Sequence, residues 1–214
     1  MQKKLIYTCF LILPYCSFAQ QAYRVIYERK DERLMSYSIN GHRPSVKLNQ
    51  LYHLIFNDSM AFRYVTGHTR IRPLNIKADM HDHFHHSSFI FKTTGAVFHS
   101  VRDQETRKRY FISDSVTESI WFIDTVIKKF MDWRCREAFT VSNTGDTLFT
   151  LLAIDFPYPY APFTKQRFPF LPLELYSDNS GIHLVVKRIE QVACKLQLPA
   201  GVPLISRKEW DALH

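Results

Sequence analysis

A run of six residues, HDHFHH, holds the side chains of this chain best suited to metal chemistry. Imidazole is the commonest protein ligand for transition metals near neutral pH. On an extended segment His81, His83 and His85 would share one side and His86 would lie on the other. A straight strand spaces such ligands too widely for one ion, so binding of Zn, Cu or Ni requires a bent segment or a further ligand. A solvated, histidine-rich loop is the alternative, and we expect no resident cofactor.

A second stretch, residues 156–172, is rich in proline and aromatic residues. Proline restricts the backbone, and aromatic side chains supply apolar area. The stretch therefore predicts either a wall for an apolar ligand or partner, or a connection whose own side chains cover one end of a sheet. The residues that would contact a ligand or partner are Phe156, Tyr158, Tyr160, Phe163, Phe168 and Phe170.

No residue pattern in the chain predicts catalysis. No serine lies in a G-x-S-x-G turn, and with only six glycines no phosphate-binding glycine loop is present. Asp114, Glu118 and Asp124 lie close in sequence, but acidic residues near strand ends usually face solvent. The formal net charge is +8, yet the basic residues are dispersed and no nucleic-acid-binding motif accompanies them. We therefore expect a non-catalytic protein that does not bind nucleic acid.

The first nineteen residues have the pattern of a secretory signal peptide. Lys3 and Lys4 precede an apolar run from Leu5 to Pro14, and small residues at the cleavage positions end with Ala19, before Gln20. The run is too short to span a bilayer, which requires roughly 20 apolar residues. We expect export, cleavage near Ala19-Gln20, a mature chain without a transmembrane segment, and a location in the periplasm, at the cell envelope or outside the cell.

The cysteines give a second prediction about the exported chain. Cleavage would remove Cys9 and Cys16 and leave Cys135 and Cys194. Lipid attachment at Cys16 is disfavoured because the bulky Tyr15 precedes it. Two cysteines in an oxidising compartment predict one disulfide, with two buried free thiols as the alternative.

The rest of the chain has the pattern of many short strands. Runs rich in Tyr, Phe, Val, Ile and Thr recur between turn signals. Evidence for helix is confined to the end, where Ser206 and Glu209 form a capping box. The pattern predicts one mainly antiparallel β domain, as a curved sheet, half-barrel or sandwich, with a short C-terminal helix. The expected hairpins join residues 50–56 to 60–65, 88–92 to 96–101, 134–141 to 147–154, and 173–176 to 182–190.

Three segments occur in the order and composition of a known family. They are YHLIFNDSMAFRY (Tyr52–Tyr64), KKFMDWRCREA (Lys128–Ala138) and FPFLPLEL (Phe168–Leu175). The chain resembles the GLPGLI family of exported bacterial proteins over residues 22–190, with Phe170 and Pro172 in place of the motif's Gly and Ile. The resemblance implies a β-rich domain over residues 20–198, similar at the level of fold to LolA-like half-barrels, followed by a tail over residues 199–214. The family has no established activity.

These observations predict an exported, non-catalytic binding or assembly protein of the periplasm or cell envelope. Its partner would be an envelope protein or an apolar ligand. A carrier of lipid or another apolar ligand inside a curved sheet is one alternative. A metal-binding module at residues 81–86 is the other.

Overall fold

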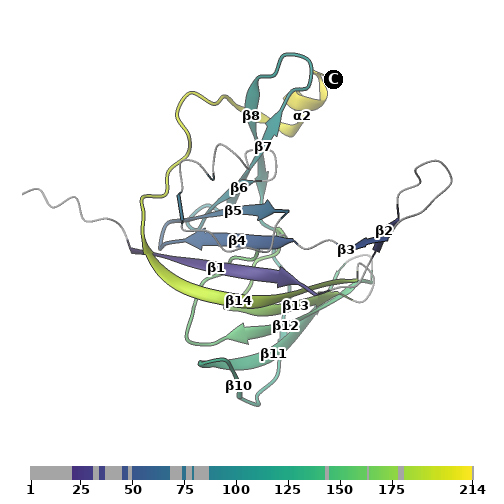
Figure 1. The fold of residues 1–214 in the computed structure, drawn as a ribbon, viewed down its shortest axis with the longest axis vertical. Coiled ribbons are helices and arrows are strands. Elements are labelled where there is room, and N and C mark those ends of the chain that lie inside the picture. The colour runs from purple at the N-terminus through teal and green to yellow at the C-terminus, as the bar shows by residue number, and fades with distance from the viewer. Residues whose placement is uncertain are drawn as a thin grey trace, which may run out of the picture.

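The computed structural model describes residues 21–30, 34–36, 45–47, 50–67, 74–75, 79, 87–142, 145–162, 164–177 and 181–213. Within these residues the predicted mainly β architecture is confirmed. Thirteen strands form one open, curved sheet, while β2 (Leu34–Ser36) and β3 (Ser45–Lys47) pair apart from it (Figure 1). Of the arrangements that the sequence left open, the structure therefore has the curved, non-closed sheet. The predicted signal segment lies outside the described residues.

Strand β1 lies in the middle of the sheet, with β10–β14 in sequence order on one side of it and β4–β8 in sequence order on the other. The order is β10-β11-β12-β13-β14-β1-β4-β5-β6-β7-β8-β15, and β9 also pairs with β11. Neighbouring strands run antiparallel except β8 and β15, which are parallel. The remaining bounds are β1 (Gln21–Arg29), β4 (Leu51–Phe56), β5 (Met60–Thr66), β6 (Ser88–Phe91), β7 (Ala96–Arg102), β8 (Arg109–Ser115), β9 (Phe122–Ile123), β10 (Lys128–Phe130), β11 (Trp133–Val141), β12 (Thr147–Ala153), β13 (Leu171–Ser177), β14 (Ile182–Ala193) and β15 (Leu204–Ser206).

All four hairpins predicted from turn signals are present, as β4–β5, β6–β7, β11–β12 and β13–β14. In the first, the side-chain oxygen of Asn57 accepts hydrogen bonds from the backbone N–H groups of Ser59 and Met60, at 2.9 and 3.0 Å. In the second, Gly95 adopts a φ of +66°, and a Cβ there would lie 2.9 Å from the Cγ2 atom of Val116. Local turn chemistry therefore fixes these connections, as the sequence indicated.

The half of the sheet made of β1 and β4–β8 buries apolar side chains on both of its faces. On β4, Leu54 and Phe56 belong to one hydrophobic cluster while Ile55, between them, belongs to another. Because successive side chains of a strand point to opposite faces, the two clusters lie on opposite faces of the sheet. We call the first, which also contains Leu148, Leu175 and Phe168, the interior cluster. The second is covered in part by the segment that follows β14, through Leu196, Leu198 and Val202.

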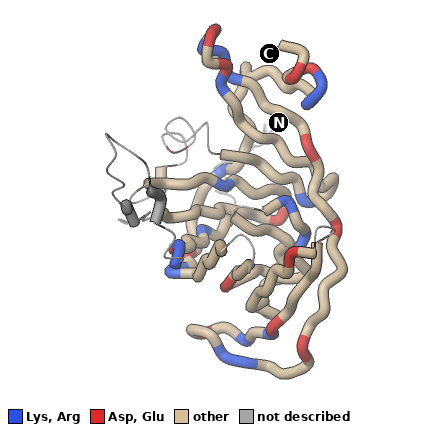
Figure 2. Tube along the Cα trace, turned by 90° about the vertical axis from the view of Figure 1, so that its right-hand side faces the viewer, with Lys and Arg blue, Asp and Glu red and all other residues tan. Residues whose placement is uncertain are grey.

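The sheet bends into an open curve when seen from the side, with acidic and basic residues scattered along the chain (Figure 2). The C-terminal segment is tied to this sheet rather than hanging free, because β15 pairs with β8. The predicted capping box opens α2 (Arg207–Asp211), where the Ser206 hydroxyl accepts from the Glu209 N–H at 3.1 Å and Glu209 accepts from the Ser206 N–H at 2.6 Å. In the described part of the chain no helix is long and apolar enough to cross a membrane.

Candidate ligand-binding face

The second half of the sheet, β11–β13, leaves part of one of its faces uncovered. Ala138, Leu148 and Leu175 are buried in the interior cluster. Their neighbours on the opposite face are not covered, and they include Phe139, Phe149 and Tyr176, whose exposed fractions are 39, 40 and 41%. The strands therefore alternate buried apolar residues with exposed aromatic ones, instead of the exposed polar ones that an ordinary solvated face carries.

Strand register brings these exposed aromatic side chains into one line. Phe139 lies opposite Phe149, Phe149 opposite Tyr176, and Tyr176 opposite His183. The short strand β9 adds Phe122, which lies opposite Phe139 and is 54% exposed. We call these five residues, Phe122, Phe139, Phe149, Tyr176 and His183, the aromatic row.

The rings of the aromatic row are close enough to form one continuous surface. Ring centroids are 5.0 Å apart for Phe122 and Phe139, 6.1 Å for Phe139 and Phe149, 6.3 Å for Phe149 and Tyr176, and 5.7 Å for Tyr176 and His183. The first three pairs are inclined to one another by 19 to 40°. Cross-strand aromatic pairs stabilise a sheet by roughly 0.2–1 kcal/mol each. This gain is small compared with the free energy that is given up when so much apolar area stays in contact with water.

A polar row lies beside the aromatic row on the same face. Glu137 and Glu174 both lie opposite Leu151, one on each side of it. Glu137 pairs with Lys128 at 2.5 Å, and Glu174 pairs with His183 at 2.6 Å. These groups are partly exposed, so solvent screening leaves the two contacts little stabilising effect. Their carboxylate oxygens remain accessible to a ligand.

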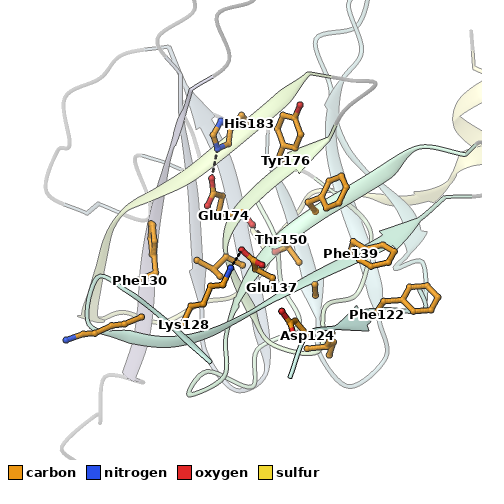
Figure 3. A pocket seen from close by; sticks show the side chains of 15 residues that line it. Phe122, Asp124, Lys128, Phe130, Glu137, Phe139, Thr150, Glu174, Tyr176 and His183 are labelled. Atoms are coloured by element: carbon orange, nitrogen blue, oxygen red, sulfur yellow. Dashed lines mark hydrogen bonds and ion pairs between the residues drawn. The ribbon is translucent and has the colours of Figure 1, made fainter. Parts of the chain in front are cut away.

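The two rows line a hollow of about 1000 Å³. Figure 3 shows Tyr176, Phe139 and Phe122 along one line, with Glu174, Glu137 and Lys128 to one side of it. The nearly buried Leu151 contributes to the lining between the two glutamates. Val141 on β11 and, between β9 and β10, Val126 and Ile127 are also exposed. We call this whole surface the aromatic face.

The predicted aromatic loop lies mostly inside the protein. Phe156, Tyr160 and Phe168 belong to the interior cluster and are at most 6% exposed. Phe156 packs on Trp133 with ring centroids 4.4 Å apart, and Phe168 on Trp121 at 4.7 Å.

The other three loop residues differ in their position. Tyr158 is half-buried and donates a hydrogen bond to Asp58 at 2.9 Å, and Phe170 packs against the interior cluster. Phe163 lies outside the described residues. In the described part, the loop therefore covers the interior of the curved sheet with its own side chains.

A buried arginine fastens this loop to the sheet. Arg63 on β5 donates to the Ser88 hydroxyl, to the carbonyl of Ala161 at 3.3 Å and to the carbonyl of Thr164 at 2.6 Å. Lys165 adds an ion pair with Asp114 on β8.

His99 lies beside this clamp. Its Nε2 atom is 3.8 Å from the Asp114 carboxylate. Burial, together with the charges of Arg63 and Lys165, lowers the pKa of His99 to about 4. His99 is therefore neutral at physiological pH. The contacts of Arg63 and Lys165 hold the loop against the sheet.

The predicted disulfide is not formed in the structure, which has Cys135 and Cys194 as free thiols. Cys135 is buried in the interior cluster, whereas Cys194 packs against the second cluster. A disulfide requires a short Cβ separation, and the two side chains pack in separate clusters. Burial raises the pKa of both thiols, which favours the protonated form.

The predicted metal site at His81, His83, His85 and His86 lies outside the described residues and stays a prediction. Elsewhere in the described chain, no group of three or more His, Cys, Asp or Glu side chains is arranged to hold a metal ion.

The sequence contained a signal for the aromatic face that strand prediction alone does not use. In EAFTV and TLFTL both sets of alternate positions hold apolar residues. A strand that is apolar on both sides is expected to be covered on both sides. Only the register of four strands shows that one of these sides is uncovered and continuous.

The sequence matches no family model and no curated protein. Among solved structures the fold is similar to that of PNGF-II, described as "Structure of PNGF-II in C2 space group". The TM-score is 0.57, with 12% identity over 90% of this chain. This chain spans 32% of that protein's length. An uncharacterized conserved protein from Thermus thermophilus aligns over 88% of this chain and 91% of its own, with 8% identity and a TM-score of 0.43. The first likeness concerns the fold alone, and the second is too distant to support an inference.

Proposed function

We propose that this chain is an exported, non-catalytic binding protein of the cell envelope, and that the aromatic face is its binding surface. The single observation that carries the proposal is the line of four exposed aromatic rings, from Phe122 to Tyr176, beside a hollow of about 1000 Å³. Apolar patches of this kind on a protein surface are typical of binding sites.

The position of the aromatic row on the sheet indicates that its exposed rings serve binding and are not needed for folding. The interior cluster already covers the other face of β11–β13, and the loop through Phe156 and Phe168 closes it. The exposed parts of Phe139, Phe149 and Tyr176, 39 to 41% of each residue, add no buried area to the folded chain. Leaving apolar surface in water forgoes roughly 25 cal/mol for each Å² that burial would remove from water. A ligand that covers the row would recover this free energy.

Three features support export and the absence of catalysis. The first nineteen residues have the pattern of a secretory signal. The segments at Tyr52–Tyr64, Lys128–Ala138 and Phe168–Leu175 resemble the exported GLPGLI family, to which we assign the chain as part of this proposal. No residue pattern in the sequence, such as a G-x-S-x-G turn or a phosphate-binding glycine loop, predicts catalysis.

Native mass spectrometry of untagged protein recovered from its own envelope tests the proposal. We expect a mature chain starting near Gln20 and an additional bound mass. The double variant Phe139→Ser with Phe149→Ser should fold, because both side chains are about 40% exposed, and should lose the bound mass.

The matched control is Leu204→Ser, which removes an exposed apolar side chain from β15 at the other end of the sheet. It should keep the bound mass. The proposal fails if wild-type protein carries no bound mass, or if the double variant carries the same one. Recovery of the intact chain with Met1 from the cytosol would contradict the export part.

A further inference from the structure

We propose that the ligand of the aromatic face is an oligosaccharide of several pyranose units. This inference rests on the proposed function, since it names the chemistry of what that surface binds. It follows from the side-by-side placement of two rows with different chemistry on one face of β11–β14, the aromatic row and the carboxylates of Glu137 and Glu174.

The aromatic row suits the apolar face of a sugar ring. The face of an aromatic ring carries partial negative charge. A pyranose ring presents C–H groups with partial positive charge on its flat side, so the two surfaces attract one another. The rings of Phe139, Phe149 and Tyr176 follow one another at 6.1 and 6.3 Å between centroids. Several sugar units in succession could therefore each lie against a ring of the row.

The polar row suits the hydroxyl groups at the edge of such a ring. Asp124, Glu137 and Glu174 all line the hollow. An ionised carboxylate accepts hydrogen bonds and donates none, so a ligand that displaces water from its exposed oxygens must supply donors. Hydrogen bonds to a charged acceptor are stronger than neutral ones. A sugar hydroxyl can supply these donors while its ring lies against the neighbouring aromatic row.

Other ligand classes fit only half of this surface. A lipid chain would cover the aromatic row but would also desolvate the carboxylates of Glu137 and Glu174 without offering a donor, which is costly. An ordinary apolar protein interface would meet the same difficulty, because charged residues are depleted at the centre of such interfaces. The exposed aliphatic side chains of Val126, Ile127 and Val141 are compatible with either a protein or an extended glycan.

The ligand would lie on the face of β11–β13 opposite Ala138, Leu148 and Leu175. The interior cluster and the loop residues Phe156, Tyr160 and Phe168 fill the curve itself. The aromatic face lies on the opposite side of β11–β13, where strand alternation directs Phe139, Phe149 and Tyr176. An extended ligand would therefore lie across the strands, along the row.

An array of bacterial, plant and animal oligosaccharides is the first experiment, followed by isothermal titration of the purified protein with the strongest ligand on the array. We expect binding by the wild type. Phe149→Ala and Glu174→Gln should each weaken the Kd about tenfold, because the first removes a ring on which a sugar would lie and the second replaces a charged acceptor by a neutral one. Both positions are exposed, so thermal melts should show folded variants.

Two control variants match these changes in kind and lie outside the aromatic face. Leu204→Ala removes an exposed apolar side chain from β15, and Glu105→Gln removes an exposed charge between β7 and β8. Each should leave the Kd unchanged. Equal binding by all four variants would overturn the proposed site, because the ligand would then be held elsewhere.

The outcomes separate the ligand class from the proposed function. A protein that binds no glycan on the array, yet carries a lipid or protein partner that the double variant Phe139→Ser with Phe149→Ser loses, overturns the oligosaccharide and leaves a binding protein. A blank array together with no bound mass in native spectra overturns both.

Discussion

Removal of the Phe168 side chain tests whether the aromatic loop is part of the core. Phe168 is 2% exposed, belongs to the interior cluster and packs on Trp121. Substitution of a fully buried phenylalanine by alanine costs about 3–5 kcal/mol of the free energy of unfolding, because apolar contacts are lost and a cavity remains. In a domain of this size each kcal/mol corresponds to about 2–4 °C in Tm. Phe168→Ala should therefore lower the Tm by about 6–20 °C.

Phe149→Ala on the aromatic face is the matched control. The chemical change is identical, but Phe149 is 40% exposed and packs on one side only, so we expect a loss of at most about 1 kcal/mol. Urea unfolding followed by tryptophan fluorescence measures both variants, since Trp121 and Trp133 both pack against the interior cluster. The reasoning is refuted if Phe168→Ala costs no more than Phe149→Ala. The loop would then act as a lid that opens without disturbing the core.

Three other perturbations probe the histidine beside the loop, a turn glycine and the two thiols. The pKa of His99 falls from 6.5 in the unfolded chain to about 4 in the folded chain, so the unfolded chain binds the extra proton and the protein loses stability as the pH falls from 6.5 toward 4. In urea titrations over this pH range, His99→Gln should lose roughly 2 kcal/mol less stability than the wild type. Parallel curves for the two proteins would contradict this. Gly95→Ala should cost more than about 1 kcal/mol and more than Gly145→Ala, because both glycines have positive φ but only at Gly95 would the new Cβ meet another atom; thermal melts decide, and equal Tm values would count against it. Alkylation in denaturant without reductant should label Cys135 and Cys194 completely in mass spectra, whereas an unlabelled pair would establish the disulfide.

Local sequence signals determined the hairpins because each depends on residues next to one another. Asn57 sets the β4–β5 turn with its own side chain, and Gly95 permits the left-handed backbone of the β6–β7 turn. The capping box of Ser206 and Glu209 likewise needs only a spacing of three residues. None of these features depends on what the rest of the chain does.

Contacts between segments that are far apart in the sequence could not be predicted from local sequence signals. The parallel pairing of β15 with β8 brings Leu204 opposite Phe111, and nothing in either segment indicates the other. The same holds for Arg63, whose contacts with the carbonyls of Ala161 and Thr164 join segments about a hundred residues apart. The separation of Cys135 from Cys194 also depends on which face of the sheet each strand turns toward the interior.

The sequence by itself determined a sheet-built chain with aromatic-rich strands, because strand propensity and turn residues are local properties. Only the tertiary structure decided which aromatic residues are buried in the core and which are exposed on the surface. Phe168 and Phe149 are the same residue type in similar apolar surroundings along the chain, yet one is buried and the other is exposed. The physical reason is that strand register and the path of one loop determine which face of a sheet is covered, and both depend on pairings between distant segments.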